Sequence, residues 1–287
     1  MAMKKTIYII SILLVVLLAM NSCSKDDNGS SSSGNIIDHQ SANLSKISGE
    51  TINKVRANLR IAYGHSSWEI GGQIIQGMIA LVNFKGSPYN ISNHLRDSVL
   101  YLNDNLLGRH SLADPNDSAW ANSTHDYLTD DTLGINVVIW CWGREVSGAT
   151  SLQIDKYLSL MNNLEKEFPK VKFVYMTGAV DGTGTKDNLY LRNEQIRAYC
   201  RANGKILYDF ADIESYDPDG KYFGDKNLKE NCTYNKNATG DGNWAIEWQS
   251  KHKEGVEWFN LNTNETEPLS INLKAYAAWS LWALLAK

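Results

Sequence analysis

Short apolar runs alternate with longer amphipathic segments along most of this chain. The runs have the length and composition of strands buried on both faces of a sheet. They lie at 59–63, 136–142, 172–177 and 205–210. The segments between them carry apolar residues three or four positions apart, which is typical of helices that cover a sheet. They lie at 70–82, 151–168, 188–203 and 269–285. Strands alternating with helices imply right-handed crossovers, so we predict an α/β fold with a doubly wound parallel sheet.

The first residues indicate a targeting segment rather than a part of this fold. Lys4 and Lys5 precede an almost wholly apolar run at 7–20, which is too short for a comfortable membrane span. A small residue then stands directly before Cys23, as in a bacterial lipoprotein signal. We therefore expect residues 1–22 to be removed and Cys23 to carry a lipid that anchors the protein to the outer membrane.

The stretch at 23–45 predicts a flexible tether, because it is rich in serine and glycine over 28–34. Its Lys-Asp-Asp run at 25–27 resembles the surface-export signal of Bacteroidetes lipoproteins, which implies a place on the cell surface. The other interpretation is a solvated linker without an address. We expect residues 46–287 to form a single domain.

The net charge bears on whether the protein binds nucleic acid, and the cysteines bear on disulfides and metal sites. Removing the two lysines of the signal leaves 26 of the 28 basic residues against 32 acidic ones, a net charge of −6. No basic block is present, so nucleic-acid binding is not favoured. An exported chain permits one disulfide among the three remaining cysteines. We predict Cys200–Cys232, because Cys141 lies within an apolar run. No cysteine or histidine spacing typical of a metal site occurs, and we expect no metal or cofactor.

The turn at 63–67, Tyr-Gly-His-Ser-Ser, joins the first apolar run to the first amphipathic segment. Such a junction exposes a serine at the carboxyl end of its strand, and the helix N-terminus directs free N–H groups at developing negative charge. The alternative is that Ser66 and Ser67 only cap the helix. Because ligands of doubly wound sheets bind beyond the carboxyl ends of the strands, Ser67 should share one rim with 143–146 and 178–184.

These residues resemble the SGNH (GDSL-like) hydrolases, in particular a branch of Bacteroidetes lipoproteins with Gly-His-Thr-Ser or a similar turn in place of Gly-Asp-Ser. The matching segments are 63–67, 137–143, 173–178, 193–200, 209–220, 243–245 and 272–275. The resemblance implies a flavodoxin-like three-layer sandwich with Ser67 as nucleophile. It also implies an oxyanion hole, a histidine just before the last helix, usually three residues after an aspartate, and ester substrates, often O-acetyl groups on polysaccharides.

Ester hydrolysis by a serine requires a base and an oxyanion hole. A neighbouring imidazole takes the hydroxyl proton, and fixed N–H donors hold the new negative charge. The donors expected here come from the Ser67 backbone, from the region of Ala113, and from Gly143 to Glu145.

The chain departs from the family pattern along this rim. Glu265 stands where the histidine aligns, and Asn262 where the aspartate aligns. An exposed glutamate near its usual pKa is a poor activator of serine at neutral pH. Arg144 and Glu145 replace a Gly-Gln pair, and Ala179 stands where relatives often have histidine. One interpretation is therefore a remodelled or lost active site.

Three other histidines are candidates for the base. His252 lies in the polar, aromatic stretch 215–264, which we expect to be an insertion over the sheet. It is the first choice, with Glu265 as the orienting carboxylate. His65, whose side chain should point away from that of the serine, and His125 are weaker candidates.

Trp142, Trp244 and Trp248 are the candidate substrate-binding residues, because flat aromatic faces suit stacking on sugar rings. Trp142 ends a strand at the rim, and the other two lie in the insertion. The alternative is a small aromatic core that holds the insertion. Trp279 and Trp282 in the last helix are expected to be core residues.

The acidic residues around 209–220 have structural and metal-binding interpretations. Asp209 and Asp212 end an apolar run, and we interpret them as buried partners of backbone N–H groups or of Arg197. Asp-Pro-Asp-Gly at 217–220 predicts a turn. A calcium site is less favoured, because the fixed pattern of a calcium loop is absent.

Three functions are consistent with these features. The leading hypothesis is a lipid-anchored surface serine esterase that removes O-acyl groups from a glycan through a Ser67 acyl-enzyme. The second is a catalytically degenerate, glycan-binding lipoprotein, suggested by the missing histidine and the aromatic insertion. The third is a glycosidase with a carboxylate pair such as Glu145 and Glu265, which needs a separation of roughly 5–10 Å.

Overall fold

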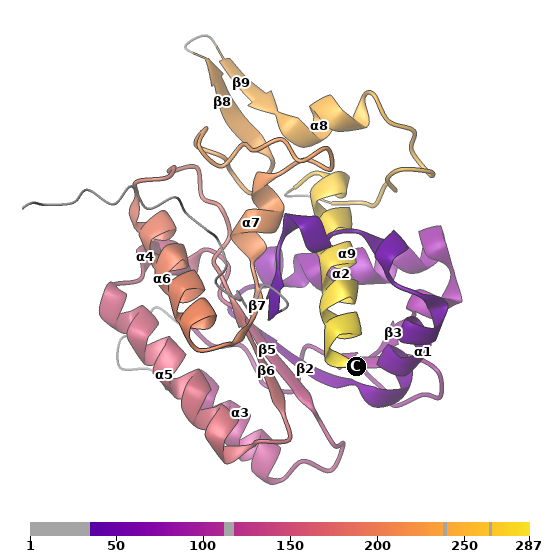
Figure 1. Cartoon of the computed structure of the whole chain (residues 1–287), viewed down its shortest axis with the longest axis vertical. Coiled ribbons are helices and arrows are strands. Elements are labelled where there is room, and N and C mark those ends of the chain that lie inside the picture. Colours follow the sequence, from indigo (N-terminus) through magenta and orange to yellow (C-terminus); the bar gives the residue numbers. More distant parts are fainter. Residues whose placement is uncertain (1–34, 112–117, 238–239, 264–265) are drawn as a thin grey trace, which may run out of the picture. The chain divides into compact units, whose positions relative to one another are not determined.

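The protein folds around a parallel β-sheet, seen in a computed structural model that describes residues 35–111, 118–237, 240–263 and 266–287. Within the described residues the sheet has seven strands in the order β1-β7-β6-β5-β2-β4-β3. Figure 1 shows its central strands β2, β5 and β6 side by side. The strands are β1 Ile36–Ile37, β2 Arg60–His65, β3 Ile91–Ser92, β4 Leu100–Asn103, β5 Val137–Cys141, β6 Lys172–Met176 and β7 Ile206–Tyr208. The central order β4-β2-β5-β6-β7 is the flavodoxin-like one, so the predicted doubly wound α/β fold is confirmed.

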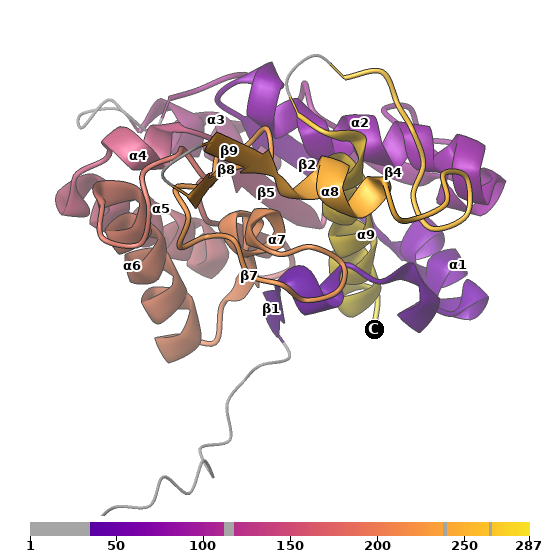
Figure 2. The same cartoon turned by 90° about the horizontal axis from the view of Figure 1, so that it is seen from above.

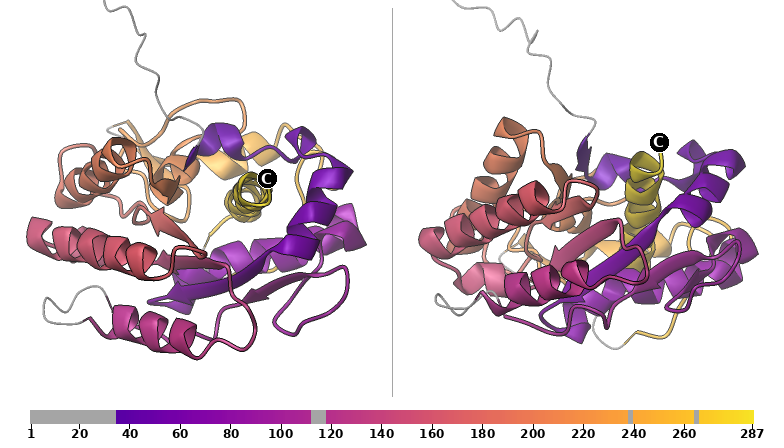
Figure 3. Two further views of the ribbon diagram at one scale, coloured as in Figure 1. Left: turned by 60° about the horizontal axis from the view of Figure 1, so that its bottom comes forward. Right: turned by 90° about the horizontal axis from the view of Figure 1, so that it is seen from below.

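Helices cover both faces of the sheet, as Figures 2 and 3 show from further directions. On one face lie α1 (Gly49–Asn58), α2 (Trp68–Lys85) and α9 (Pro268–Leu285). On the other lie α3 (Ala119–Thr129), α5 (Ser151–Glu167) and α6 (Asn188–Ala202). The shorter elements are η2 (His39–Ser41), η3 (Leu44–Lys46), η4 (Ser87–Tyr89), α4 (Glu145–Gly148), α7 (Phe210–Ser215), α8 (Trp244–Gln249), and the hairpin of β8 (Thr233–Asn237) and β9 (Gly240–Asn243). The three layers agree with the prediction.

The central strands are apolar at successive positions because helices cover both of their faces. In β5, Ile139 and Cys141 join the core beneath α2 and α9. Val138 and Trp140 join the core beneath α3 and α5. Successive side chains of a strand point to opposite faces, so burial on both sides produces an unbroken apolar run.

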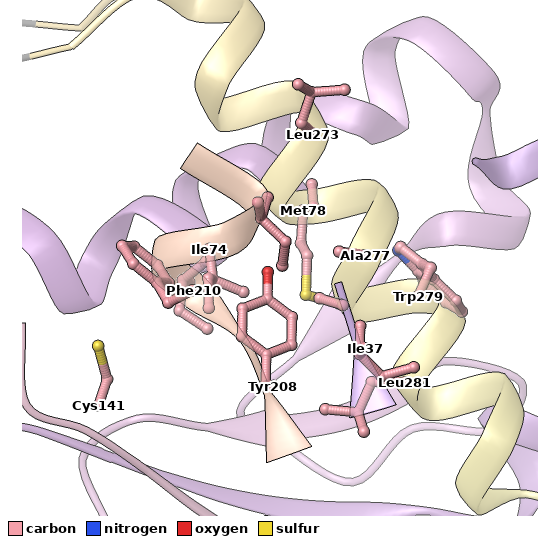
Figure 4. Packing of buried hydrophobic residues seen from close by; sticks show 14 of the residues in the cluster. Ile37, Ile74, Met78, Cys141, Tyr208, Phe210, Leu273, Ala277, Trp279 and Leu281 are labelled. Carbon is pink, nitrogen blue, oxygen red and sulfur yellow. The ribbon is translucent and has the colours of Figure 1, made fainter. Parts of the chain in front are cut away.

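Helix α9 is enclosed by the rest of the fold, and 13 of its 18 residues are buried. Figure 4 shows Met78 of α2, Tyr208 of β7 and Phe210 of α7 in the core that this helix joins. Trp279 and Trp282 are 0% and 1% exposed, which confirms that they are core residues.

The structure corrects the extent of the predicted tether. Residues Ile36–Ile37 form β1, which pairs with β7, and η2 and η3 follow. The backbone N–H of His39 donates to Asp212 at 2.9 Å. Residues 35–45 therefore belong to the folded part of the chain and not to the tether predicted for 23–45.

The predicted Cys200–Cys232 disulfide is wrong. Cys141, Cys200 and Cys232 are all free and buried. Cys200 packs in the core beneath α5 and α6, and Cys232 packs in the core on the α9 side. The sheet lies between these two cores, so the two thiols cannot meet.

The insertion at 215–264 lies against loops that leave the carboxyl ends of the strands. The backbone N–H of Gly182, beyond β6, donates to the carbonyl of Leu228 at 2.9 Å. At its other end, the N–H of Leu269 donates to the side chain of Gln249 at 3.2 Å. The insertion thus extends the rim on which the sequence places the candidate site.

Candidate functional site

The carboxyl ends of β2 and β5 form the topological switch point of the sheet. The two strands are parallel neighbours, paired from Ile61 and Val137 to His65 and Cys141. The chain leaves β2 for α2 on one face and leaves β5 for α5 on the other. A crevice between strands that diverge in this way is where doubly wound folds bind ligands.

The two serines of the turn have different surroundings at this point. Ser66 is used structurally, because its N–H donates to the Cys141 carbonyl at 3.1 Å and its Oγ donates to the Trp142 carbonyl at 3.1 Å. Ser67 is the N-cap of α2, with φ −135° and ψ 151°, yet its side chain makes no capping hydrogen bond. Among the described residues the Ser67 hydroxyl has no hydrogen-bond partner, so it is available to a ligand beside the helix N-terminus.

His65 lies beneath the first turns of α2 and is 1% exposed. Its Nε2 is 3.9 Å from Asp104 Oδ2. Burial lowers the pKa of His65, Asp104 opposes this shift, and Arg109 adds to it. A Cβ at Gly71 would lie 2.4 Å from that of His65, so the imidazole is closely packed. His65 is therefore an interior residue of the turn.

The rim beside Ser67 carries an ion-paired arginine. Gly143 has φ +53°, and a Cβ there would lie 3.1 Å from Cβ of Ile70 in the first turn of α2. The next residue, Arg144, donates from Nε to Glu230 of the insertion at 2.7 Å and makes a second contact through Nη2. Its Nη1 lies 3.6 Å from Glu69 of α2. The structure thus places Gly143 next to α2, with a charged network formed by Arg144, Glu230 and Glu69.

The remaining rim positions belong to the loops after β5 and β6. Glu145 begins α4, and its N–H donates to the Trp142 carbonyl at 3.0 Å. Ala179 is buried, and its N–H donates to the Gly143 carbonyl at 3.0 Å. A histidine, which the resemblance predicts at this position, would need more space than the buried Ala179 occupies.

The expected sugar-stacking role needs correction for two tryptophans. Trp142 is 0% exposed and lies parallel to Trp140 at 5.2 Å between ring centroids. Trp244 is 1% exposed and packs against Phe223. Rings enclosed in the interior have no face open to a sugar, so the alternative of an aromatic core describes these two residues. Trp248, at 8% exposed, does line a cleft.

His252 and Ser67 are not brought together. His252 stacks on Trp248, with 3.5 Å between centroids and 2° between planes, and its Nδ1 is 2.8 Å from Glu257 Oε1. It lines a cleft with Phe84, in the last turn of α2. Ser67 caps the other end of this 18-residue helix. At 1.5 Å per residue, Ser67 and Phe84 are about 25 Å apart along the helix axis. His252 therefore does not act as the base for Ser67 in this structure.

Other predicted residues lie away from the switch point or outside the described residues. His125 is on α3, bonded to Asp126 at 3.1 Å and Glu167 at 3.0 Å, and these carboxylates raise its pKa. Glu265, Ala113 and Cys23 lie outside the described residues. Because Glu265 is not described, its distance from Glu145, on which the glycosidase hypothesis depends, is not given by this structure.

The acidic residues after β7 hold the fold together, as the sequence predicts. Asp209 accepts hydrogen bonds from Arg197 at 2.6 and 2.7 Å and from Thr177 at 3.0 Å. The turn at 217–220 is closed by the N–H of Gly220 on the Asp217 carbonyl at 2.9 Å. Within the described ranges no group of three potential metal-ligating side chains is present.

A large cleft that the sequence did not predict lies in this part of the molecule, and we call it the aromatic cleft. Its volume is about 820 Å³, and it lies between η2, the last turn of α2, the turn at 217–220, the stretch after α8, and α9. Six rings line it: His39, Phe84, Tyr216, Trp248, His252 and Tyr276. Three carboxylates stand among them: Asp217, Asp219 and Glu257. Only Trp248 and His252 were candidates, because elements far apart in sequence build this wall.

Two stacked pairs give the aromatic cleft its shape. His39 lies on Tyr216 with 3.6 Å between centroids and 10° between planes, and its Nδ1 is 2.5 Å from Asp212. The pair of His252 and Trp248 repeats the arrangement, with a carboxylate on Nδ1. In both pairs Nε2 has no partner among the described residues, so each imidazole keeps one hydrogen-bonding atom for a ligand.

The chain has a remote likeness to a known structure. No protein-family model matches the chain, and no curated protein matches it. Among solved structures, it is similar to one described as a "putative acylhydrolase" from Bacteroides fragilis, with 11% identity and a TM-score of 0.33 over 63% of this chain and 83% of that one. No helix in the described part is long and apolar enough to cross a membrane. The strand order and the two helical layers of the described residues, and not this likeness, define the three-layer α/β fold.

Proposed function

We propose that this protein binds a neutral glycan in the aromatic cleft. The observation that carries the proposal is the wall of the cleft, where six aromatic rings stand among carboxylates around about 820 Å³. Sugars present flat C–H faces that pack on aromatic rings, and hydroxyl rims that hydrogen-bond to carboxylates and imidazoles. The volume is within the range of small-ligand sites.

The charges along the cleft favour an uncharged ligand. Asp217, Asp219 and Glu257 contribute carboxylates, against a single lysine, Lys85, in the described wall. The Lys85 ammonium lies 4.0 Å from the centre of the Phe84 ring. A uronic acid or sulfated sugar would meet net repulsion from such a wall.

The test is binding of the soluble protein, starting at Ser24, to a panel of neutral and acidic polysaccharides. We expect a neutral polysaccharide to bind, and Trp248→Ala to weaken binding at least tenfold because it removes a wall ring and the support of His252. Trp68→Ala is the matched control, since Trp68 is 40% exposed and does not line the cleft. Melting curves verify folding. Absence of binding, or equal loss in both variants, contradicts the proposal.

Ester hydrolysis at Ser67 is the second candidate, and one specific observation favours it. The hydroxyl stands without a hydrogen bond at the N-cap of a long helix, at the switch point of the sheet. Among the described residues no imidazole hydrogen-bonds to it, so a base would have to come from elsewhere, with Glu265 the aligned candidate. Release of acetate or p-nitrophenol from acyl esters, lost in Ser67→Ala, would establish this activity. Equal, negligible rates for both proteins would count against it.

We further propose that Cys23 carries a lipid that anchors the protein at the outer-membrane surface. The apolar run at 7–20 and the tether after Cys23 support this proposal. Cys23→Ala should move the protein from the membrane fraction to the soluble fraction. Protease treatment of intact cells tests surface exposure, and a protected protein would contradict it.

A further inference from the structure

A second cleft adjoins the aromatic cleft, and we call it the tyrosine cleft. Its volume is about 390 Å³, and it lies between the end of β1, the loop after β6, α6 and the segment after α7. Tyr190 and Tyr222 stand on its wall and are 37% and 40% exposed. Asp181 and Thr183 add polar groups, whereas the buried amide of Asn193 is bonded to the Gly178 backbone. The tyrosine cleft thus has the same combination of open aromatic rings and hydrogen-bonding groups as the aromatic cleft.

One stacked pair of rings separates the two clefts. Tyr216 lines both of them. His39, stacked on Tyr216, faces the aromatic cleft, whereas Asp212, which holds His39 Nδ1, faces the tyrosine cleft. Tyr222 lies 5.0 Å from Tyr216 between ring centroids on the tyrosine-cleft side. The partition is therefore a single layer of side chains, with aromatic groups on both sides of it.

We infer that the two clefts are subsites of one binding site for a linear, neutral oligosaccharide that crosses the Tyr216–His39 pair. The inference rests on the proposed glycan-binding function and adds to it a requirement for chain length. A short oligosaccharide occupies the aromatic cleft alone, whereas a longer chain also reaches Tyr190 and Tyr222. Joining two subsites in one ligand makes the second contact intramolecular, which raises affinity without any new kind of contact.

The experiment measures affinity as a function of chain length. Cello-, xylo- and manno-oligosaccharides from disaccharide to octasaccharide are titrated into the soluble protein by calorimetry. For the series that binds, we expect Kd to fall at least tenfold between the short and the long members. Tyr222→Ala and Tyr190→Ala should each abolish most of this gain and leave the affinity for the short members unchanged. Trp68→Ala, on a ring that lines neither cleft, should keep the full gain.

The outcomes separate this inference from the function on which it rests. Binding without a length-dependent gain, or a gain that survives in both tyrosine variants, overturns the inference and leaves glycan binding in the aromatic cleft intact. Binding of no oligosaccharide at any length overturns both. Two variants on different elements, α6 and the segment after α7, guard against a folding defect in either one.

Discussion

A buried lysine joins three helices beneath the rim. Lys274 of α9 is 0% exposed, its Nζ lies 2.7 Å from Glu214 of α7, and it also donates to Gln73 of α2. The second Glu214 oxygen accepts the N–H of Val180 at 2.8 Å. Burial raises the pKa of Glu214, and Lys274 opposes the rise. Removing either ion leaves the other charged and buried, which is costly.

Lys274→Met should therefore lower the free energy of unfolding by about 3–5 kcal/mol at neutral pH. In this variant the pKa of Glu214 in the folded state rises further above its ordinary value of 4.5, so the folded protein binds more protons than the unfolded one. The loss should consequently be smallest below pH 4.5 and grow as the pH rises. Urea unfolding at several pH values measures it. Adding Glu214→Gln should recover part of the stability at neutral pH, and a double variant no better than the single one would contradict this account.

Gly71 of α2 packs closely against His65, so an alanine at this position should change the stability of the protein. Alanine normally favours a helix over glycine by about 1 kcal/mol. Here the new methyl group would lie 2.4 Å from Cβ of His65, and overpacking costs about 1–3 kcal/mol. Gly71→Ala should thus destabilise the protein by up to about 2 kcal/mol in chemical denaturation. Gly148→Ala is the control, because no atom lies within 4 Å of its added Cβ. A stabilised Gly71→Ala would show that the turn under α2 can shift.

In the helices, some N-cap hydroxyls form a capping hydrogen bond, whereas others are left without one. Thr150 forms a capping box with Gln153 at the start of α5, accepting from its N–H at 3.3 Å and donating to its side chain from the backbone at 2.7 Å. Ser118 of α3 and Ser67 of α2 cap their helices without a side-chain bond. The Ser67 hydroxyl is therefore not required for the stability of α2.

Thr150→Ala should lower the free energy of unfolding by about 1 kcal/mol, the usual effect of removing a side-chain cap. Ser118→Ala and Ser67→Ala should change it by a few tenths at most, because no capping bond is lost. Thermal or urea unfolding of the three variants checks the difference. A loss in Ser67→Ala as large as that in Thr150→Ala would show that its hydroxyl is structural.

The long helices, and the strands within apolar runs down to the three-residue β7, were predictable from sequence, whereas the short elements outside such runs were not. The expected helices at 151–168 and 188–203 became α5 and α6, because their apolar spacing extends over several turns. Strands β1 and β3 have only two residues each and β4 has four, so they carry too little periodicity to recognise. The position of Ser67 at the rim could be predicted, because a recognisable strand precedes it and a recognisable helix follows it. The aromatic cleft could not, because five separate parts of the chain meet there.

At the scale of the whole molecule, the two cores on opposite faces of the sheet explain the cysteines. Composition suggested one bridge, but the spacing of cysteines along the chain does not show on which face each lies. Burial raises the pKa of Cys141 to about 11 and those of Cys200 and Cys232 to about 12. Buried thiols with raised pKa values react slowly.

We expect the soluble protein starting at Ser24 to show almost no reaction with Ellman's reagent while folded, and to react at all three remaining cysteines in denaturant. A reducing agent should leave its melting temperature unchanged, because no disulfide is present among the described cysteines. A melting temperature that falls on reduction would contradict the free thiols.

Because α9 is buried, the protein cannot complete its fold before this last helix has been synthesised. This helix supplies Trp279 and Trp282 to the main core and Lys274 to the pair with Glu214. Until residues 268–285 have been synthesised, α2 lacks a covering layer and Glu214 lacks its counter-ion. A nascent chain that ends before α9 therefore leaves the core beside α2 uncovered, and native structure forms only after this helix has emerged.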